Sequence, residues 1–417
     1  MLESGNVGTA LSRAGTSAPN VPATLHASLM ARLDRLSPTA KEVAQVGAAL
    51  GREFSYELLA AVAQRNAAEL DAALDQLVVA GLAFRRGTPP QATFLFKHAL
   101  VQDAAYGTLL RGKRQELHRR VAYVLEEQWP ETAETQPELL AHHYAQAGLV
   151  ERAIAYYTRA GQRAGARTAM AEAIAQLRKG LELLTSLPDC ASRQRQELEL
   201  QITLGRALIA AQGYAAPAVG ETYARARALC EQLDRPPEIV PVLYGQCAQY
   251  ISKGRLRRAR EIAAELLQVG EAGGVVAITV LGHRLSTSAC FHLGEFLTAR
   301  AHLEQGLALF DPGHRPFYTS FHIQDPLGTL LNYHSIDLYC LGYFDQARLE
   351  CEAAVEEGHK DGHAFSLTAA LSGACQVDWG TRSREELLAR RMRSSPSRTS
   401  TDFPGIAPLE PSRAARG

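Results

Sequence analysis

TFLFKHALVQDAAYGTLL, residues 93–110, joins two kinds of architecture. Phe94 and Phe96 are two residues apart, the spacing that places both rings on one face of a β-strand. Leu100 and Ala104 then recur at the spacing of a helix. The stretch therefore predicts a strand that leads directly into a helix.

The residues before this stretch predict a β-hairpin that follows a helix. Leu82–Arg86 and Thr93–His98 have the composition of short strands, and a Gly-Thr-Pro-Pro turn separates them. Asn66 is suited to cap a preceding helix, and Gly81 stands where that helix would end. A helix followed by a hairpin is typical of a winged-helix module.

Residues 1–21 are rich in Gly, Ser and Ala and show no period, so we expect a disordered lead-in. Residues 22–63 predict three helices, of which the second begins at Ser37-Pro38 and the third covers Phe54–Ala63. Gln115–Gln128 predicts a further amphipathic helix. The basic residues around it form either a solvated face or a contact for an acidic partner or an upstream domain. We expect one helical and winged-helix-like module over residues 22–133.

Residues 134–379 contain helical repeats of the tetratricopeptide type. Pro137, Leu140, Ala141 and Tyr144, followed by Ala153 and Tyr157, match the spacing of that repeat with conservative changes. A turn of Gly, one residue, an apolar residue, two residues and Ala occurs four times. The four copies are Gly148 to Ala153, Gly254 to Ala259, Gly294 to Ala299, and Gly342 to Ala347.

The intervals between these turns predict an irregular array. They are 40 residues from Gly254 to Gly294 and 48 from Gly294 to Gly342, against ~34 in the standard unit. Asp311–Pro326, which is rich in proline, is the expected insertion. The fold class is therefore mainly α: a winged-helix-like module with a small β-hairpin, followed by an irregular α-solenoid.

Aromatic residues on the first helix of several pairs are candidates for a partner groove. They are Tyr244, Tyr250, Phe291, Tyr333 and Tyr339. The alternative is that these rings pack inside the array, as aromatic residues at helical spacing commonly do. In the first case, the ligand is a protein or a peptide of unknown identity.

The composition predicts a soluble cytoplasmic protein without cofactors. The net charge of the 417 residues is zero, which gives the whole chain no preference for nucleic acid or an anionic membrane. Its seven Cys residues include no C-x-x-C pair. There is no signal-peptide pattern, and no apolar run approaches the ~20 residues of a membrane span.

The motifs of common catalytic and cofactor sites are absent from the sequence. There is no phosphate-binding G-x-x-x-x-G-K-[ST], no dinucleotide fingerprint and no G-x-S-x-G. His142 and His143 are adjacent and should point to different faces of a helix. His359 and His363 have the spacing of metal ligands, but a glycine precedes each of them, Gly358 and Gly362, and we expect these glycines to form a loop. We predict no catalytic, cofactor-binding or metal-binding residue.

Several segments resemble the region that follows the cyclase and ATPase domains in bacterial class III adenylate/guanylate cyclase–ATPase signalling proteins, a group of signal-transduction (STAND) NTPases. The matching segments are Ser28–Leu36, Gly51–Ala63, Leu77–Gly87, Phe96–Leu110, Glu134–Leu149 and Gly213–Leu233. The resemblance implies a winged helix and tetratricopeptide-like repeats. The catalytic cyclase and ATPase cores would lie before residue 1.

The resemblance implies a non-catalytic regulatory and protein-interaction region, with docking to a nucleotide-switch ATPase. It ends near Trp379, and residues 380–417 are expected to be a disordered or out-of-frame tail. A fragment of a larger signalling protein and a free-standing adaptor are both compatible with this pattern. For a fragment, we expect an exposed apolar patch near Leu25–Leu36.

A winged-helix transcription regulator with a repeat sensor is the main alternative, and an adenylate cyclase is a third. The first would place the helix before the hairpin in the major groove of DNA. That helix carries Glu69, Asp71 and Asp75, and residues 66–81 include no Lys or Arg. Since phosphates repel carboxylates, we expect no nucleic-acid binding.

Overall fold

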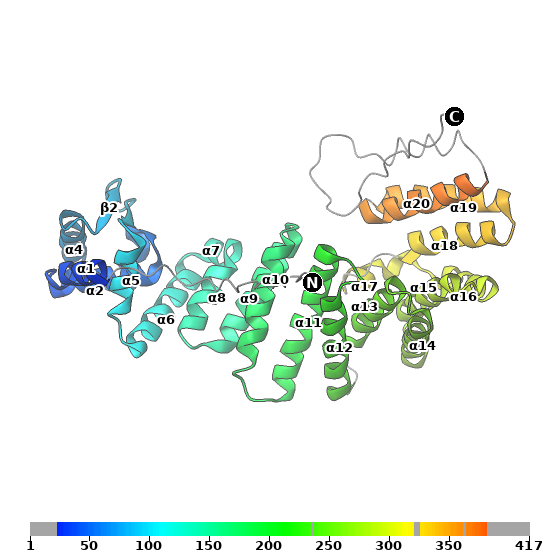
Figure 1. The fold of residues 1–417 in the computed structure, drawn as a ribbon, viewed down its shortest axis with the longest axis horizontal. Coiled ribbons are helices and arrows are strands. Elements are labelled where there is room, and N and C mark those ends of the chain that lie inside the picture. The colour runs from blue at the N-terminus through cyan, green and yellow to red at the C-terminus, as the bar shows by residue number, and fades with distance from the viewer. Residues whose placement is uncertain (1–22, 235–236, 321–325, 362–363, 382–417) are drawn as a thin grey trace, which may run out of the picture. The chain divides into compact units, whose positions relative to one another are not determined.

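The computed structural model describes residues 23–234, 237–320, 326–361 and 364–381 (Figure 1). These residues form α-helices and one small antiparallel sheet, which confirms the mainly α fold class. The chain divides into two compact units. Unit 1 consists of Met1–Arg167 and Ala175–Leu187, and unit 2 of Thr168–Ile174 and Pro188–Gly417. None of the described helices is long and apolar enough to cross a bilayer.

The first part of unit 1, called the sheet module below, combines helices with the sheet. Its elements are α1 (Ala23–Asp34), α2 (Pro38–Leu50), β1 (Glu53–Ser55), α3 (Tyr56–Ala63), α4 (Ala67–Val79), β2 (Ala83–Arg86), β3 (Thr93–Phe96), α5 (Ala99–Gly107), α6 (Arg111–Gln128) and α7 (Pro130–Thr135). The predicted hairpin is present as β2 and β3, and β3 leads into α5 as expected. The helix predicted from Gln115 starts at Arg111.

A third strand is the main local difference from the sequence prediction. Glu53–Ser55 pairs antiparallel with β3, so that the strand order is β1-β3-β2. Phe54 was predicted to begin a helix, but this helix begins at Tyr56. The Ser55 hydroxyl accepts a hydrogen bond of 3.2 Å from the backbone N–H of Leu58 and so caps α3.

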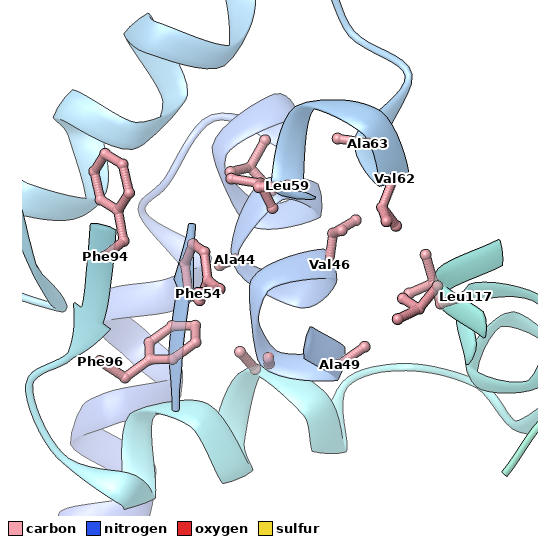
Figure 2. Packing of buried hydrophobic residues seen from close by; sticks show 14 of the residues in the cluster. Ala44, Val46, Ala49, Phe54, Leu59, Val62, Ala63, Phe94, Phe96 and Leu117 are labelled. Carbon is pink, nitrogen blue, oxygen red and sulfur yellow. The ribbon is translucent and has the colours of Figure 1, made fainter. Parts of the chain in front are cut away.

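Phenylalanine rings from β1 and β3 form the centre of the sheet's buried face (Figure 2). The ring of Phe54 lies 6.0 Å from that of Phe94 and 5.5 Å from that of Phe96. We predicted an exposed apolar patch near Leu25–Leu36. Two of its residues, Leu29 and Leu33, are instead buried in the same cluster as the phenylalanine rings. The prediction of an exposed apolar patch on α1 is therefore wrong at these two positions, because α1 packs against α5.

Local capping explains where α4 begins and ends. The side-chain oxygen of Asn66 accepts a hydrogen bond of 2.9 Å from the backbone N–H of Glu69. At the other end Gly81 has φ +63°, and the Leu82 N–H bonds to the Leu77 carbonyl at 2.9 Å. This left-handed glycine closes the helix as predicted.

Two helices of the repeat type belong to unit 1. These are α8 (Pro137–Gln146) and α9 (Val150–Ala166), joined at Gly148. The residues of the repeat pattern in this pair are buried in one core with the sheet module: Leu140, Ala141, Tyr144, Ala153 and Tyr157. Unit 1 therefore continues beyond residue 134, where the repeats were expected to form a separate domain.

Glu126 of α6 links the sheet module to this helix pair. Its carboxylate accepts hydrogen bonds from the Tyr144 hydroxyl, from the Tyr156 hydroxyl at 2.8 Å and from Arg152 at 3.0 Å. Hydrogen bonds to an ionised group are stronger than those between neutral groups. The contact between α6 and α8 is therefore polar as well as apolar.

Unit 2 is a helical array. After α10 (Met170–Leu184), which both units share, it contains α11 (Ala191–Gln212), α12 (Pro217–Gln232), α13 (Ile239–Ser252), α14 (Leu256–Gly273), α15 (Val276–His292), α16 (Phe296–Leu309), α17 (Arg315–Ser320), α18 (Pro326–Cys340), α19 (Phe344–Asp361) and α20 (Ala364–Gly380). Each helix from α11 to α15 packs against the next, α16 packs against α18, and α19 packs against both α18 and α20. The helices α11, α13, α15, α18 and α20 also contact one another in that order. This is the pairwise stacking of an α-solenoid.

The expected insertion interrupts the array before α18. It contains a short 3-10 helix at Pro312–His314 and α17. His359, which was assigned to a loop, lies within α19, while His363 lies outside the described residues. The predicted lead-in and residues 382–417 of the predicted tail also lie outside them.

Candidate functional site

The four repeat turns share one backbone geometry. Gly148, Gly254, Gly294 and Gly342 have φ values of +75°, +68°, +80° and +90°. In each turn the residue after the glycine donates its N–H to the carbonyl five residues earlier, at 2.9–3.0 Å. Only glycine adopts this conformation without strain, which explains its recurrence.

The alanine of each turn lies at a contact between helices. Ala153, Ala259, Ala299 and Ala347 are all 0% exposed. A small side chain at this position lets the two helices of a pair approach closely. The eight turn residues therefore have structural positions.

The five aromatic residues predicted to line a groove lie on the first helix of three successive helix pairs in unit 2. Tyr244 and Tyr250 are on α13, Phe291 is on α15, and Tyr333 and Tyr339 are on α18. All five are half-buried. The structure brings Phe291 and Tyr333 together, with ring centroids 5.4 Å apart. Tyr339 instead contacts Phe344 of α19, and Tyr244 lies against Arg284.

Phe291 and Tyr333 are part of a mixed aromatic and polar group, the Tyr333 cluster, which also contains Ser288 and His292. The Ser288 hydroxyl donates to the Tyr333 hydroxyl at 2.7 Å. The same hydroxyl lies 3.2 Å from Nε2 of His292, an exposed side chain. The cluster therefore offers apolar rings beside polar groups that can still exchange hydrogen bonds with a ligand.

A second group, the Arg–Tyr cluster, occupies α11 to α15. It consists of Arg206, Tyr214, Tyr223, Tyr244 and Arg284. The Cζ atom of Arg284 lies 4.9 Å from the ring centroid of Tyr244. Nη2 of Arg284 is 3.5 Å from the Thr329 hydroxyl, and its buried Nε has no hydrogen-bond partner among the described residues.

Two close approaches of glycine hold Tyr223 in place. A Cβ added at Gly245 would lie 2.3 Å from Cζ of Tyr223, and one at Gly205 would lie 2.9 Å from the same ring. The tyrosine ring therefore fills the space between α11 and α13, and both positions exclude a side chain.

The electrostatics of the Arg–Tyr cluster involve its own members. Burial raises the pKa of Tyr244 to about 12, and Arg284 opposes this rise. Burial also raises the pKa values of Tyr214 and Tyr223, where Arg284 and Arg206 respectively oppose it. The pKa of Arg206 is lowered by burial. Burial thus keeps the tyrosines as neutral hydroxyls that can donate hydrogen bonds.

The sequence patterns did not predict a site at Arg206, Tyr214, Tyr223 or Arg284. Arg284 carries one available signal, because it is the only Asp, Glu, Lys or Arg within α15. The other three residues have no such signal, since their proximity depends on how α11, α12 and α13 pack.

Unit 1 contains a buried histidine pair. Nδ1 of His118 lies 2.8 Å from Nδ1 of His143, and Nε2 of His118 lies 2.8 Å from the Tyr106 hydroxyl. His142 is exposed, whereas its neighbour His143 is buried, as expected for adjacent helical residues. Within the described ranges, no group of three or more His, Cys, Asp or Glu side chains could hold a metal ion.

The helix before the hairpin presents acidic side chains to solvent. Glu69, Asp71 and Asp75 of α4 are all exposed. Asp75 forms an ion pair of 3.0 Å with Arg85 of β2, and Arg65 lies 3.6 Å from Glu69. The exposed face of α4 is therefore acidic.

Comparisons with known proteins give one curated relative and a solved structure. No family model matches the chain. An uncharacterized protein of Rhizobium meliloti (strain 1021) is 28% identical over 290 residues, which are 68% of this chain and 27% of that protein. The chain thus spans about a quarter of the length of this relative.

The solved structure is that of a Signal Transduction ATPase with Numerous Domains (STAND) protein with a tetratricopeptide repeat sensor from Pyrococcus horikoshii. It is 12% identical to this chain, with a TM-score of 0.43. The match covers 87% of this chain and 58% of that one.

Proposed function

We propose that this chain is a non-catalytic regulatory region that binds a protein partner through the first helix of successive helix pairs in unit 2. The observation that carries the proposal is the Tyr333 cluster, in which half-buried aromatic rings and hydrogen-bonding groups of α15 and α18 lie together. Aromatic residues with a polar end are enriched in protein interfaces, because they bury apolar area and still form hydrogen bonds.

The motif resemblance supplies the wider context of the proposal. In this proposal, residues 22–133 act as the winged-helix-like module of a cyclase–ATPase signalling protein, and the joint between β3 and α5 supports that assignment. In such a protein, unit 2 would bind the partner. The module in unit 1 would transmit this event to an ATPase and a cyclase.

The shared core of unit 1 supports transmission. The helix pair α8 and α9 packs in one cluster with the sheet module, and Glu126 binds residues of both α8 and α9. A movement of the helix pair would therefore act directly on α6.

Affinity capture with matched variants tests partner binding. Wild-type protein, Tyr333→Ala and Leu297→Ala should be compared as baits, since Leu297 is an exposed residue of α16 outside the Tyr333 cluster. We expect a partner that is retained by wild type and by Leu297→Ala and is lost with Tyr333→Ala. An identical set of captured proteins for all three baits would contradict the proposed surface.

A nucleotide assay tests the non-catalytic part of the proposal. The purified chain, supplied with ATP and Mg²⁺ or Mn²⁺, should produce no cyclic AMP above a blank. Production in proportion to protein concentration would show that catalytic groups exist in this chain.

A further inference from the structure

We propose that the Arg–Tyr cluster binds carboxylate groups of an acidic peptide segment in the partner, with Arg284 and Arg206 as the cationic contacts. This inference rests on the proposed function, in which unit 2 binds a protein. It adds the chemistry of the ligand and a second contact region on α11, α13 and α15.

Arg206 and Arg284 differ from other partly buried arginines of unit 2. Arg227 donates to both oxygens of Glu265, and Arg300 donates to Glu304 at 2.8 Å. Arg206 and Arg284 are half-buried as well. Neither has an ion pair with another described residue. A partly buried charge without an internal counter-charge is costly, and an anionic ligand would supply that counter-charge.

The surroundings of these two charges also favour an anionic ligand. The groups that act electrostatically on Tyr214, Tyr223 and Tyr244 are Arg206, Arg284, one another and Cys247. Within the part of the chain that the structure describes, no carboxylate is among them. The site is thus cationic and lined with hydroxyl groups, a combination that favours oxyanions.

The guanidinium of Arg284 has a geometry suited to a carboxylate. The ring of Tyr244 lies against this guanidinium, and Nη2 makes a long contact of 3.5 Å to the Thr329 hydroxyl. Nε of Arg284 is buried and has no hydrogen-bond partner among the described residues, so one donor of the planar fork is unsatisfied. Such a fork matches the two oxygens of a carboxylate better than a lysine ammonium does.

The distribution of the cluster favours an extended ligand. Arg206, Tyr244 and Arg284 come from α11, α13 and α15, which contact one another in this order, and Thr329 and Tyr333 follow on α18. A peptide that crosses these helices can place successive side chains on them. A single phosphate ion reaches only part of the row.

Fluorescence anisotropy with two labelled peptides tests this inference on the full chain. One is a ten-residue peptide rich in Glu, and the other has every Glu replaced by Gln. We expect the acidic peptide to bind at least tenfold more tightly. Equal affinity for both peptides would overturn the proposal. So would competition in which millimolar inorganic phosphate displaces the peptide as well as unlabelled peptide does, because the site would then be a phosphate site.

Matched variants locate the binding. Arg284→Gln and Arg206→Gln should each weaken acidic-peptide binding about tenfold or more, and Arg284→Lys should retain part of the affinity. Arg258→Gln is the control, since Arg258 is an arginine of α14 that pairs with Glu261 at 2.5 Å on the surface. A loss in Arg258→Gln equal to that in Arg284→Gln would show general charge attraction and would overturn the assignment.

Thermal stability separates a ligand-binding role from a structural one. If the charge of Arg284 is compensated only by a ligand, the unliganded Arg284→Gln variant should have a melting temperature equal to or above that of the wild type, because the change removes an uncompensated charge. A clearly lower melting temperature would assign Arg284 an internal role and overturn the inference. Capture by the Tyr333 cluster is measured separately, so failure of the acidic peptide alone leaves the proposed function standing.

Discussion

The Nδ1 atoms of His118 and His143 lie 2.8 Å apart inside unit 1, and both side chains are 2% exposed. One of the two nitrogens must carry a proton and the other must accept it, so the pair is stable only when at least one ring is neutral. His118 comes from α6 and His143 from α8. The protonation of this pair therefore bears on the contact between the sheet module and the first helix pair.

We predict that the stability of unit 1 falls as the pH falls from about 6.5 towards 4. Burial, and then the charges of His142 and Arg114, lower the pKa of His118 to about 4, and burial lowers that of His143 to about 3. Below pH 6.5 the unfolded chain therefore binds more protons than the folded chain. The free energy of unfolding should decrease by about 1.4 kcal/mol per pH unit for each histidine. Urea denaturation between pH 7.5 and 4.5 measures this slope.

Variants identify the groups responsible for that pH dependence. Arg114, His142 and Lys179 are the charged groups near the pair. His143→Gln should flatten the slope, whereas His98→Gln, a change at an exposed histidine, should leave it intact. An equally steep slope in His143→Gln would show that other groups dominate.

Gly294→Ala should destabilise unit 2 by about 1 kcal/mol. A Cβ at this position would meet no atom within 4 Å, so the cost comes from the φ of +80° alone. Gly328→Ala is the matched control, because Gly328 lies within α18 with equally open surroundings. Alanine favours a helix there and should be neutral or stabilising. The two variants are compared by thermal denaturation, and equal melting temperatures would contradict this account of the turns.

Gly282→Ala should be more harmful than either of these changes. A Cβ at Gly282 would lie 2.6 Å from Cα of Leu267, and one at Gly270 would lie 2.5 Å from the backbone nitrogen of Thr279. The backbones of α14 and α15 would have to separate, at a cost of about 1–3 kcal/mol or more. Chemical denaturation relative to Gly328→Ala measures the difference, and a cost below that of Gly294→Ala would refute close backbone contact.

Asp337→Asn should stabilise the protein at pH 7.5. Asp337 is buried, and neither of its carboxylate oxygens has a hydrogen-bond partner among the residues of known position. Burial raises its pKa to about 6, with Arg300 opposing and Glu304 adding to the rise. The folded state therefore holds a proton between about pH 4 and 6 that the unfolded state loses, and stability falls as the pH rises through this interval.

At pH 7.5 the asparagine variant avoids this loss, which is on the order of 3 kcal/mol. At pH 4.5 the difference from wild type should shrink. Asp345→Asn, a change at an exposed acid of α19, serves as the control. A variant as unstable as wild type at pH 7.5 would mean that the carboxylate is satisfied in solution.

Local signals in the sequence predicted the ends of elements well. Asn66 and Gly81 act on backbone groups within five residues of themselves, so no tertiary information is needed to place them. The four glycine turns are equally local. In contrast, β1 exists through its pairing with β3, whose residues are about forty positions away, and a three-residue strand has no period of its own.

The candidate sites were less predictable for the same reason. Tyr333 and Phe291 were identified by residue type and helix position, but their contact depends on the packing of α15 against α18. The Arg–Tyr cluster was missed because its arginines resemble ordinary surface residues until the absence of a neighbouring carboxylate is known. The fold follows from local patterns, whereas the charge balance of a site follows from packing.

The hydrogen bonds of Glu126 with Tyr144, Tyr156 and Arg152 have a consequence for the gene. Recombination that exchanged the repeats at codon 134 would remove the donors of a half-buried carboxylate and open the core of the sheet module. Only exchanges beyond α9 would preserve both. We therefore expect α8 and α9 to be inherited together with the sheet module in related proteins, while the number of later repeats can vary.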